Sequence, residues 1–216
     1  MKRLTHVNDI IKIQAGQKLK VTVLNLGITS ASVIKIDKNS LELEITSDFQ
    51  KPSSPEWHVV VGLSRPPTMK KVLEHGSSLG IKHFHFLPAT LSEKSYATSK
   101  IWEEDKLQET LCDGISQSAN YWQLPKVTHY TNLTQLPSFD NFDKRILSLA
   151  TGSGPMPNID KSQPLVLAFG PERGWTANED ELLRNSGFKP VSIAPSVLRV
   201  EIALFAALGQ CHYLVK

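Results

Sequence analysis

The chain has 216 residues, of which 40% are hydrophobic and 21% charged, so it can bury a sizeable core. No apolar stretch approaches the roughly 18 to 20 residues that cross a bilayer, and the opening residues lack the apolar segment of a signal peptide. The two cysteines, Cys112 and Cys211, lie far apart and outside any Cys-x-x-Cys pattern, which argues against a disulfide framework or a zinc ribbon. We therefore expect a globular cytoplasmic protein in which both thiols are buried.

The formal net charge is only +3, but it is distributed unevenly. Residues 1–100 contain 14 Lys and Arg against 8 Asp and Glu, whereas residues 101–216 contain 10 against 13. The front part therefore carries +6 and the back part −3. This asymmetry is compatible with a basic face that contacts nucleic-acid phosphates, although scattered surface lysines would produce the same imbalance.

Short runs of alternating apolar and polar side chains fill the first fifty residues. These runs lie at 18–23, 31–36 and 41–45. A period of two predicts half-buried strands. Gly27 and the polar cluster at 37–40 separate the runs, and their spacing favours a small antiparallel barrel. The segment at 50–55, which contains Pro and Ser, is typical of a linker.

From Trp57 the pattern changes to apolar strands that alternate with longer helical stretches, which predicts an α/β domain. Predicted strands lie at 57–63, 83–87, 126–130, 145–149 and 165–169, and predicted helices at 69–79 and 102–119. In the second helix Leu107, Leu111 and Ile115 recur every four residues, along a face that we expect to pack in the core. The run at 165–169 is continuously apolar, as expected for a central strand that is covered on both faces.

A short loop follows this apolar strand. Its sequence is Gly170-Pro171-Glu172-Arg173-Gly174-Trp175. Thr176 and Glu179 then form a capping box that opens a helix, which should end at Gly187. A strand at 190–193, a turn at 194–196 and an amphipathic helix at 197–214 complete the chain.

The loops at 170–175 and 194–197 each follow a strand and lead into a helix. In open α/β sheets, ligands bind at the carboxyl ends of strands, where helix N-termini leave backbone amides unpaired. Gly170 and Gly174 let the backbone approach a ligand closely, while Pro171 stiffens the turn. The first loop lacks the Lys-Ser or Lys-Thr of a phosphate-binding P-loop, and alone it is more often an ordinary turn.

The combination of motifs is more specific than either loop. Gly170 to Gly174, the acidic helix start, Gly187-Phe188, a strand and Val197-Leu198-Arg199-Val200-Glu201-Ile202-Ala203 together resemble the C-terminal signature of the RsmE family. That family has Gly-Pro-Glu-Gly-Gly followed by Leu-Arg-Thr-Glu-Thr-Ala. Leu79-Gly80-Ile81, Ser92-Glu93-Lys94-Ser95 and Gln117-Ser118 resemble further stretches of the same family. Its members are SPOUT methyltransferases that methylate N3 of a uridine in small-subunit (16S) ribosomal RNA.

The resemblance implies a SPOUT-type α/β methyltransferase domain at 56–216 with a C-terminal trefoil knot. It also implies a small PUA-like antiparallel β-barrel at 1–52 that binds RNA. This barrel is shortened, because the family's Arg-Phe-Phe opening strand has no counterpart ahead of His6. The implied cofactor is S-adenosylmethionine, without a metal ion. The implied partners are small-subunit ribosomal RNA or the assembled subunit, and a second copy of the chain in a homodimer whose active site draws on both subunits.

Roles for individual residues follow from the resemblance. Arg199 is expected to stabilise negative charge on the uracil ring, and Glu201 to orient that arginine or help the N3 proton depart. The expected cofactor contacts are Ala150, Thr151, Gly170, Pro171, Glu172, Gly174, Ile193, Ala194, Val197 and Leu198. The expected RNA contacts are Lys70, Lys71, Lys94 and Asn120. The alternatives are a helix-surface pair for Arg199 and Glu201, a helix-dipole role for Glu172, and solvated lysines.

The chain departs from the family pattern at four positions. Arg173 replaces a glycine, Val200 and Ile202 replace two threonines, and Asn120 stands where an arginine is expected. These differences remove two hydroxyl groups and one charge that contacts RNA. Two other hypotheses therefore stay open: a methyltransferase that acts on another RNA, and an RNA-binding relative with weak catalysis.

His83 and His85 share one face of a predicted strand, a placement that suits metal binding. No third ligand at metal-site spacing accompanies them in the sequence, so we expect histidines at the core or its rim. Trp102 and Trp122 are expected to pack against apolar neighbours rather than to stack on a base.

Overall fold

The computed structural model describes residue 4 and residues 12–149 and 154–213. The chain divides into two compact units. The smaller unit comprises Met1–Ser53 with Ala119–Gln123, and the larger unit comprises Ser54–Ser118 with Leu124–Lys216. The smaller unit contains an antiparallel sheet and the larger unit a parallel one.

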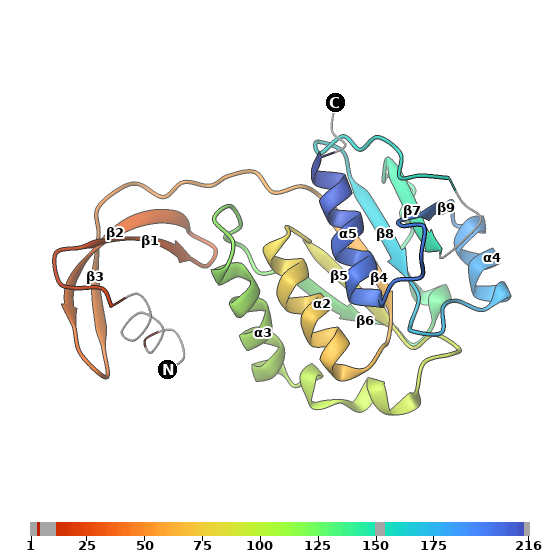
Figure 1. The fold of residues 1–216 in the computed structure, drawn as a ribbon, viewed down its shortest axis with the longest axis horizontal. Helices are drawn as coiled ribbons and strands as arrows, with labels where there is room; N and C mark the ends of the chain where they lie inside the picture. The colour runs from red at the N-terminus through yellow and green to blue at the C-terminus, as the bar shows by residue number, and fades with distance from the viewer. Residues whose placement is uncertain (1–3, 5–11, 150–153, 214–216) are drawn as a thin grey trace. The chain divides into compact units, whose positions relative to one another are not determined.

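The sheet of the smaller unit has three antiparallel strands in the order β1-β2-β3. Their bounds are Lys18–Val23, Gly27–Ile36 and Leu41–Ile45 (Figure 1). The central strand β2 begins earlier than predicted, because a tight turn pairs Gly27 with Val23. Ile28, Ala31 and Val33 of β2 are buried and form the core of the unit. The predicted small antiparallel β-domain is confirmed, whereas closure of the described strands into a barrel stays a prediction.

The segment 119–123 belongs to this smaller unit, although the sequence pattern places it in the second domain. The Asn25 amide donates to the Trp122 carbonyl at 3.0 Å, and the indole nitrogen of Trp122 donates to the Pro52 carbonyl at 3.2 Å. The Lys51 ammonium lies 5.9 Å from the centre of the same indole ring. Trp122 is therefore a packing residue, as expected. Asn120, an expected RNA contact, lies in this segment.

The larger unit is built on a parallel sheet in the order β6-β5-β4-β8-β7-β9. Its strands are β4 Trp57–Gly62, β5 His83–Leu87, β6 Lys126–His129, β7 Lys144–Leu149, β8 Leu165–Phe169 and β9 Lys189–Ser192. Every residue of β8 is buried, in agreement with the prediction of a central strand covered on both faces. The predicted α/β architecture is confirmed, and all carboxyl ends of these strands lie at one edge of the sheet.

Helices cover both faces of this sheet. They are α2 Pro66–Ser78, α3 Glu104–Ser116, α4 Ala177–Asn185 and α5 Val200–Tyr213. In Figure 1, α2, α3 and α5 lie together on the near face, where Trp57 and Phe84 enter the larger core cluster. On the other face, Leu183 of α4 packs with Val60 and Leu147 in a second cluster. Alternate residues of β4 thus face different cores, which is the period expected of a strand.

Several helix boundaries differ from the prediction by two or three residues, including the start of α2, at Pro66 rather than 69, and the end of α3, at Ser116 rather than 119. The final helix begins at Val200 rather than at 197, and the Arg199 carbonyl accepts its first hydrogen bond from the Ala203 amide at 2.8 Å. Residues 194–199 are irregular, and all of them except Pro195 line a cavity. The helix predicted at 102–119 begins at Glu104, after two 3₁₀ turns at Lys94–Thr98 and Lys100–Trp102.

The packing of Trp102 and Cys211 agrees with the prediction, whereas that of Cys112 does not. Trp102 packs as expected, with its ring 5.0 Å from that of Phe86 and its indole nitrogen donating to the Tyr96 carbonyl at 2.8 Å. Cys211 is buried, and burial raises the pKa of its thiol to about 12. Cys112 is only half-buried on α3, so the prediction that both thiols are buried is wrong for this residue.

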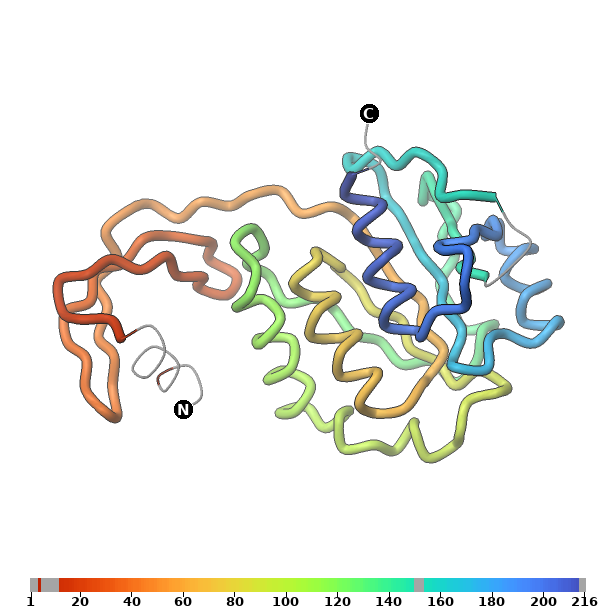
Figure 2. Tube along the Cα trace, in the orientation of Figure 1, coloured from red at the N-terminus to blue at the C-terminus, as the bar shows by residue number. Residues whose placement is uncertain are grey.

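Figure 2 traces the chain from β8 through α4 and β9 into α5. The trefoil knot implied by the family resemblance depends on how the chain passes through 150–153, which lies outside the described residues. The knot therefore stays a prediction. None of the described helices is long and apolar enough to span a membrane.

Glu179 joins two loops of the larger unit. It completes the predicted capping box of α4, accepting hydrogen bonds from the Thr176 amide and hydroxyl, both at 2.8 Å. Its other oxygen accepts from the Thr90 amide at 2.7 Å and the Thr90 hydroxyl at 3.1 Å. Burial by itself raises the pKa of Glu179, but the hydrogen bonds from Thr176 and Thr90 outweigh it and hold the pKa below its ordinary value of 4.5.

We expect Glu179→Gln to lower the free energy of unfolding by about 1–3 kcal/mol at neutral pH, because bonds to a buried carboxylate are lost. A carboxyl group with a lowered pKa stabilises the fold above its ordinary pKa and loses that contribution as the pH falls through the folded value. The difference between wild type and variant should therefore shrink below pH 4.5. Urea unfolding across this pH range measures it. Glu181→Gln, at an exposed position of the same helix, is the control; a pH-independent difference for Glu179→Gln would contradict the assignment.

A close approach of two helices generates a second prediction. A Cβ atom added to Gly114 of α3 would meet the Glu74 carbonyl oxygen of α2 and lie 2.9 Å from the Ser77 Cβ. Because backbone cannot move aside as a flexible side chain can, Gly114→Ala should destabilise the fold by about 1–3 kcal/mol. Gly209→Ala in α5, where nothing lies within 4 Å, should instead be neutral or stabilise by up to about 1 kcal/mol. Equal unfolding midpoints for the two variants would contradict the close approach of α2 and α3 at Gly114.

Candidate active site

A cavity of about 520 Å³ opens at the edge of the sheet where β7, β8 and β9 end. Its walls are the loop that follows β8 and the irregular segment that follows β9. The lining residues are Arg65, Ser148, Leu149, Phe169, Gly170, Pro171, Glu172, Arg173, Gly174, Trp175, Ile193, Ala194, Ser196, Val197, Leu198, Arg199, Val200 and Ala203. The charged lining residues are three arginines and one glutamate, which gives the cavity a basic rim.

The first wall is a compact turn at the end of β8. The Gly174 amide donates to the Pro171 carbonyl at 2.8 Å, which closes the turn. Gly174 has a φ of +74°, in the left-handed region that L side chains rarely adopt, so this position requires glycine. Gly170 lies so close to Gly174 that an added Cβ would stand 2.9 Å from the Gly174 carbonyl carbon. The turn therefore exposes backbone rather than side chains to part of the cavity.

Glu172 connects this turn to the neighbouring strand. Its Oε1 accepts two hydrogen bonds from Arg65: one from the backbone amide at 3.0 Å and one from Nε at 3.3 Å. Arg65 directly precedes α2 and follows β4, which pairs with β8. An exposed ion pair of this kind contributes little to stability, so its effect is to fix the two loops relative to each other.

The second wall runs from Ile193 to Arg199. Gln210 of α5 donates to the Ile193 carbonyl at 2.9 Å, and the Ser192 hydroxyl donates to the Ala194 carbonyl at 2.9 Å. These bonds hold the start of the segment against the sheet and the final helix. Val197 is 76% exposed at the cavity, and Arg199 is exposed beside it. Arg199 forms no ion pair with a described acidic residue, which leaves its guanidinium available to a ligand.

Glu201 lies apart from the cavity lining. It is 3% exposed, sits in the first turn of α5, and its carboxylate lies 3.4 Å from the Lys71 ammonium of α2. No described contact joins Glu201 to Arg199, and the expectation that Glu201 orients Arg199 or helps the N3 proton depart stays a prediction. The buried carboxylate joins α2 to α5 and lies where the helix dipole favours negative charge.

The structure brings together nine of the residues singled out from the sequence. Gly170, Pro171, Glu172, Gly174, Ile193, Ala194, Val197, Leu198 and Arg199 all line the cavity. Ala150 and Thr151 lie outside the described residues. Lys70 and Lys94 are exposed, and Lys71 is exposed but paired with Glu201. Asn120 belongs to the smaller unit.

Sequence reasoning missed Arg65, although a signal for it was present. Leu63-Ser64-Arg65 follows an apolar strand and leads into a helix that begins with Pro66, the same pattern that marked the other loops. The pattern could not show that β4 and β8 pair, which places Arg65 beside Glu172. The sequence analysis also missed His58, which the pairing of β4 with β5 places beside His83 and His85.

The sequence profile of the RNA methyltransferase domain family matches residues 51–212. "Ribosomal RNA small subunit methyltransferase E 1" of Borreliella burgdorferi is 28% identical over 208 residues, covering 95% of this chain and 87% of the relative. "Ribosomal RNA small subunit methyltransferase E" of Treponema pallidum is 28% identical over 222 residues, with coverage of 95% and 80%. These relatives confirm the resemblance drawn from the sequence motifs.

Solved structures have the same fold. A methyltransferase of Legionella pneumophila, in complex with the bound cofactor SAM, superposes with a TM-score of 0.77 at 20% identity, over 99% of this chain and 90% of that one. The ribosomal RNA small subunit methyltransferase E of Neisseria gonorrhoeae, bound to S-adenosylmethionine, gives 0.72 at 19% identity, with coverage of 99% and 90%. The family profile covers most of the larger unit and the structural likeness covers almost the whole chain. This protein belongs to the RNA methyltransferase domain family.

Proposed function

We propose that this protein transfers a methyl group from S-adenosylmethionine to N3 of a uridine in small-subunit ribosomal RNA. The observation that carries the proposal is the cavity at the carboxyl ends of the strands, in a chain of the RNA methyltransferase family. Its loops expose backbone groups, and it presents Arg199, which forms no ion pair with any acidic residue in the described part of the chain. The substrate is inferred from the relatives named for the small ribosomal subunit. This wall composition supports a nucleotide-like cofactor beside an RNA base.

The cavity fits S-adenosylmethionine in size and chemistry. Its volume of about 520 Å³ falls within the range of about 300–1,000 Å³ that is usual for small-molecule sites. Phe169, Ile193 and Leu198 offer apolar surface for an adenine ring, and the turn from Gly170 to Gly174 offers backbone groups for its polar edge. Arg65 and Arg173 of the rim favour the carboxylate at the other end of the molecule. Leu149, the last residue of β7, lines the same cavity, so the next two residues along the chain, Ala150 and Thr151, are proposed to complete the site.

The bound sulfonium supplies an electrophilic methyl group, so the protein has to position the uracil and assist the loss of its N3 proton. Arg199 is the residue suited to this task, because it is exposed at the cavity wall and always positively charged. We assign to it the stabilisation of negative charge that develops on the uracil ring as the proton departs. Glu201 acts indirectly, because its buried carboxylate pairs with the exposed Lys71 and fixes the start of the helix that follows Arg199.

The RNA is proposed to contact exposed basic residues and the smaller unit. Lys70 and Lys94 are exposed and supply phosphate contacts without sequence preference. Residues 1–100 carry a net charge of +6, which supports RNA binding by this part of the chain. We further propose that the protein acts in the cytoplasm as a homodimer, in which each active site draws on both subunits.

The proposal is tested by methyl transfer from labelled S-adenosylmethionine to unmodified small ribosomal subunits and to their naked RNA, followed by mass spectrometry of the nucleosides. We expect 3-methyluridine. A different methylated nucleoside would identify another target atom. Cofactor binding without transfer to either substrate would favour action on another RNA, and the absence of cofactor binding would favour a non-catalytic RNA-binding protein.

Arg199→Ala should lower the rate of methyl transfer by about 100-fold or more, the cost of removing one group that stabilises charge in a transition state. Calorimetric affinity for S-adenosylmethionine should change little, because the role concerns the uracil. Arg184→Ala is the control, since Arg184 pairs with Asp180 on α4 and does not line the cavity. Unchanged transfer by Arg199→Ala would exclude the assigned role.

A further inference from the structure

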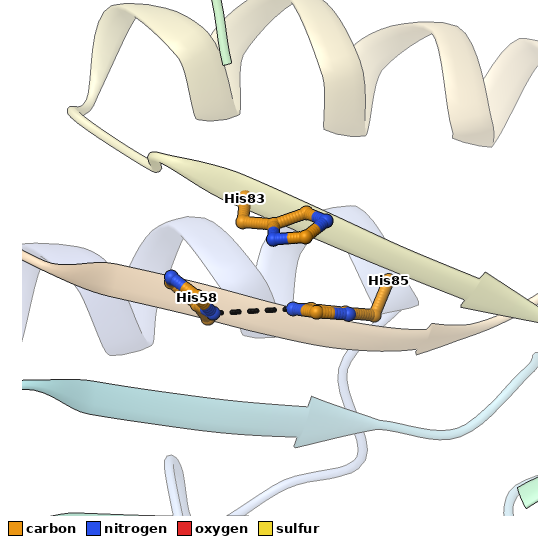
Figure 3. Close-up of side chains that lie close together, drawn as sticks. All are labelled: His58, His83 and His85. Carbon is orange, nitrogen blue, oxygen red and sulfur yellow. Dashed lines mark hydrogen bonds between the residues drawn. The ribbon is translucent and has the colours of Figure 1, made fainter. Parts of the chain in front are cut away.

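Three histidines gather on the sheet face that also carries α4, away from the candidate active site. His58 is the second residue of β4, and His83 and His85 are the first and third of β5. Parallel pairing places His58 opposite His83. The side chains point to the same side of the two strands (Figure 3), the side on which Phe139 and Phe142 pack. The cluster lies near the amino ends of the strands, whereas the cavity lies at their carboxyl ends.

The ring nitrogens of these histidines converge. One nitrogen from each of the three rings lies within 4.8 Å of the other two. The Nδ1 of His58 and the Nε2 of His85 are 3.1 Å apart, as the dashed line in Figure 3 marks. Two imidazoles bound to one tetrahedral ion are separated by about 3.4 Å, given metal–nitrogen bonds of about 2.0–2.1 Å. The pair therefore needs to move by only a few tenths of an ångström to share an ion.

Each histidine uses its outer nitrogen for a bond to a side-chain oxygen. The Nε2 of His58 bonds to Glu56 at 3.0 Å, the Nε2 of His83 to the Thr128 hydroxyl at 2.8 Å, and the Nδ1 of His85 to the Tyr130 hydroxyl at 2.9 Å. Histidines that bind metals almost always donate their second ring nitrogen to such an oxygen, which fixes the ring and its tautomer. The remaining nitrogens are Nδ1 of His58, Nδ1 of His83 and Nε2 of His85, and the first and third of these share a hydrogen bond that a common ligand would replace.

The surroundings keep the imidazoles neutral, as metal ligands must be. His85 is 1% exposed, and the ring centres of Phe139 and Phe142 lie 5.3 Å from His85 and 4.8 Å from His58, respectively. Burial lowers the pKa of His83 to about 4 and that of His85 to about 3, with a smaller effect from neighbouring positive charges. Lys82 and Lys126 lie near the cluster and oppose a cation, although Glu56 pairs with Lys82.

We propose that His58, His83 and His85 bind one divalent transition-metal ion of the zinc type, with three imidazole ligands and water in the remaining position. Imidazole nitrogens suit zinc, copper and nickel rather than magnesium or calcium. The hydrogen bond between His58 and His85 is then replaced by two metal–nitrogen bonds. In the metal-free chain one of these two nitrogens carries the proton of that bond. With His58 protonated on Nε2 toward Glu56, the proton is on Nε2 of His85, and metal binding moves it through solvent to Nδ1 of the same ring, where it is donated to the Tyr130 oxygen. Both rings stay neutral and the net number of bound protons is unchanged. The ion joins β4 to β5 at the end of the sheet opposite the candidate active site.

The test is equilibrium dialysis of the untagged, chelator-treated full chain against Zn²⁺, with metal analysis. We expect one bound ion per chain. His83→Ala, at a half-buried position, should weaken binding by more than about 100-fold, beyond the usual effect of losing an outer hydrogen-bond partner. His129→Ala is the matched control, because this exposed histidine of β6 stacks on Phe86 and meets Trp102 edge to face, at the other face of the sheet. It should bind Zn²⁺ like the wild type.

Two further variants test the site without replacing any of the three histidines, because a substitution of the buried His85 could disturb folding. Glu56→Gln and Tyr130→Phe keep all three histidines and should weaken Zn²⁺ binding by about 10-fold, because each alters an outer partner. Circular dichroism checks the fold of each variant, and the visible spectrum of bound Co²⁺ should show coordination by nitrogen. Absence of stoichiometric Zn²⁺ binding by the wild type would overturn the proposal. So would equal losses of binding in His83→Ala and His129→Ala.

Discussion

The parallel pairing of β8 between β4 and β7 is the constraint on which the other features of the larger unit depend. Every residue of β8 is buried, so the strand is fixed by packing on both faces as well as by its ladders. Because the neighbouring strands run the same way, the loops after β4, β7 and β8 meet at one edge. This arrangement brings Arg65, Leu149 and the turn after Phe169 to one cavity, although they are widely separated in sequence.

Two carboxylates hold the loops at this edge. Glu172 joins the turn after β8 to Arg65, and Glu179 joins the start of α4 to Thr90 after β5. Each carboxylate fixes backbone at this edge of the sheet, so it contributes to the shape of the site without contacting a ligand. Glycine at the positive φ of Gly174 acts in the same way, by permitting a turn that no other residue adopts without strain. The candidate site is thus a product of loop positioning more than of reactive side chains, which suits a reaction whose electrophile is a cofactor.

The two ends of the sheet have different chemistry. The carboxyl end carries the cavity with its three arginines, and the amino end carries the three histidines between β4 and β5. The two sets share β4, whose alternate residues face different cores. A metal ion bound by the histidines would therefore help to fix the position of β4. Arg65, which lines the cavity, follows this strand along the chain. Any effect on the candidate active site would pass through the strand rather than through direct contact.

The sequence by itself determined the α/β architecture, the capping box of Thr176 and Glu179, and most of the cavity wall, because these depend on local periodicity, helix capping and adjacent motif residues. It did not determine the start of the final helix, since the apolar pattern continues through 197–199, whereas in the structure these residues are irregular and line the cavity. Only the tertiary structure decided that Arg65 meets Glu172, that Glu201 meets Lys71, and that 119–123 joins the smaller unit. It alone brought His58 to His83 and His85. The reason is physical: strand order and register set these contacts between distant segments, and no local pattern in a single sequence encodes which strands become neighbours.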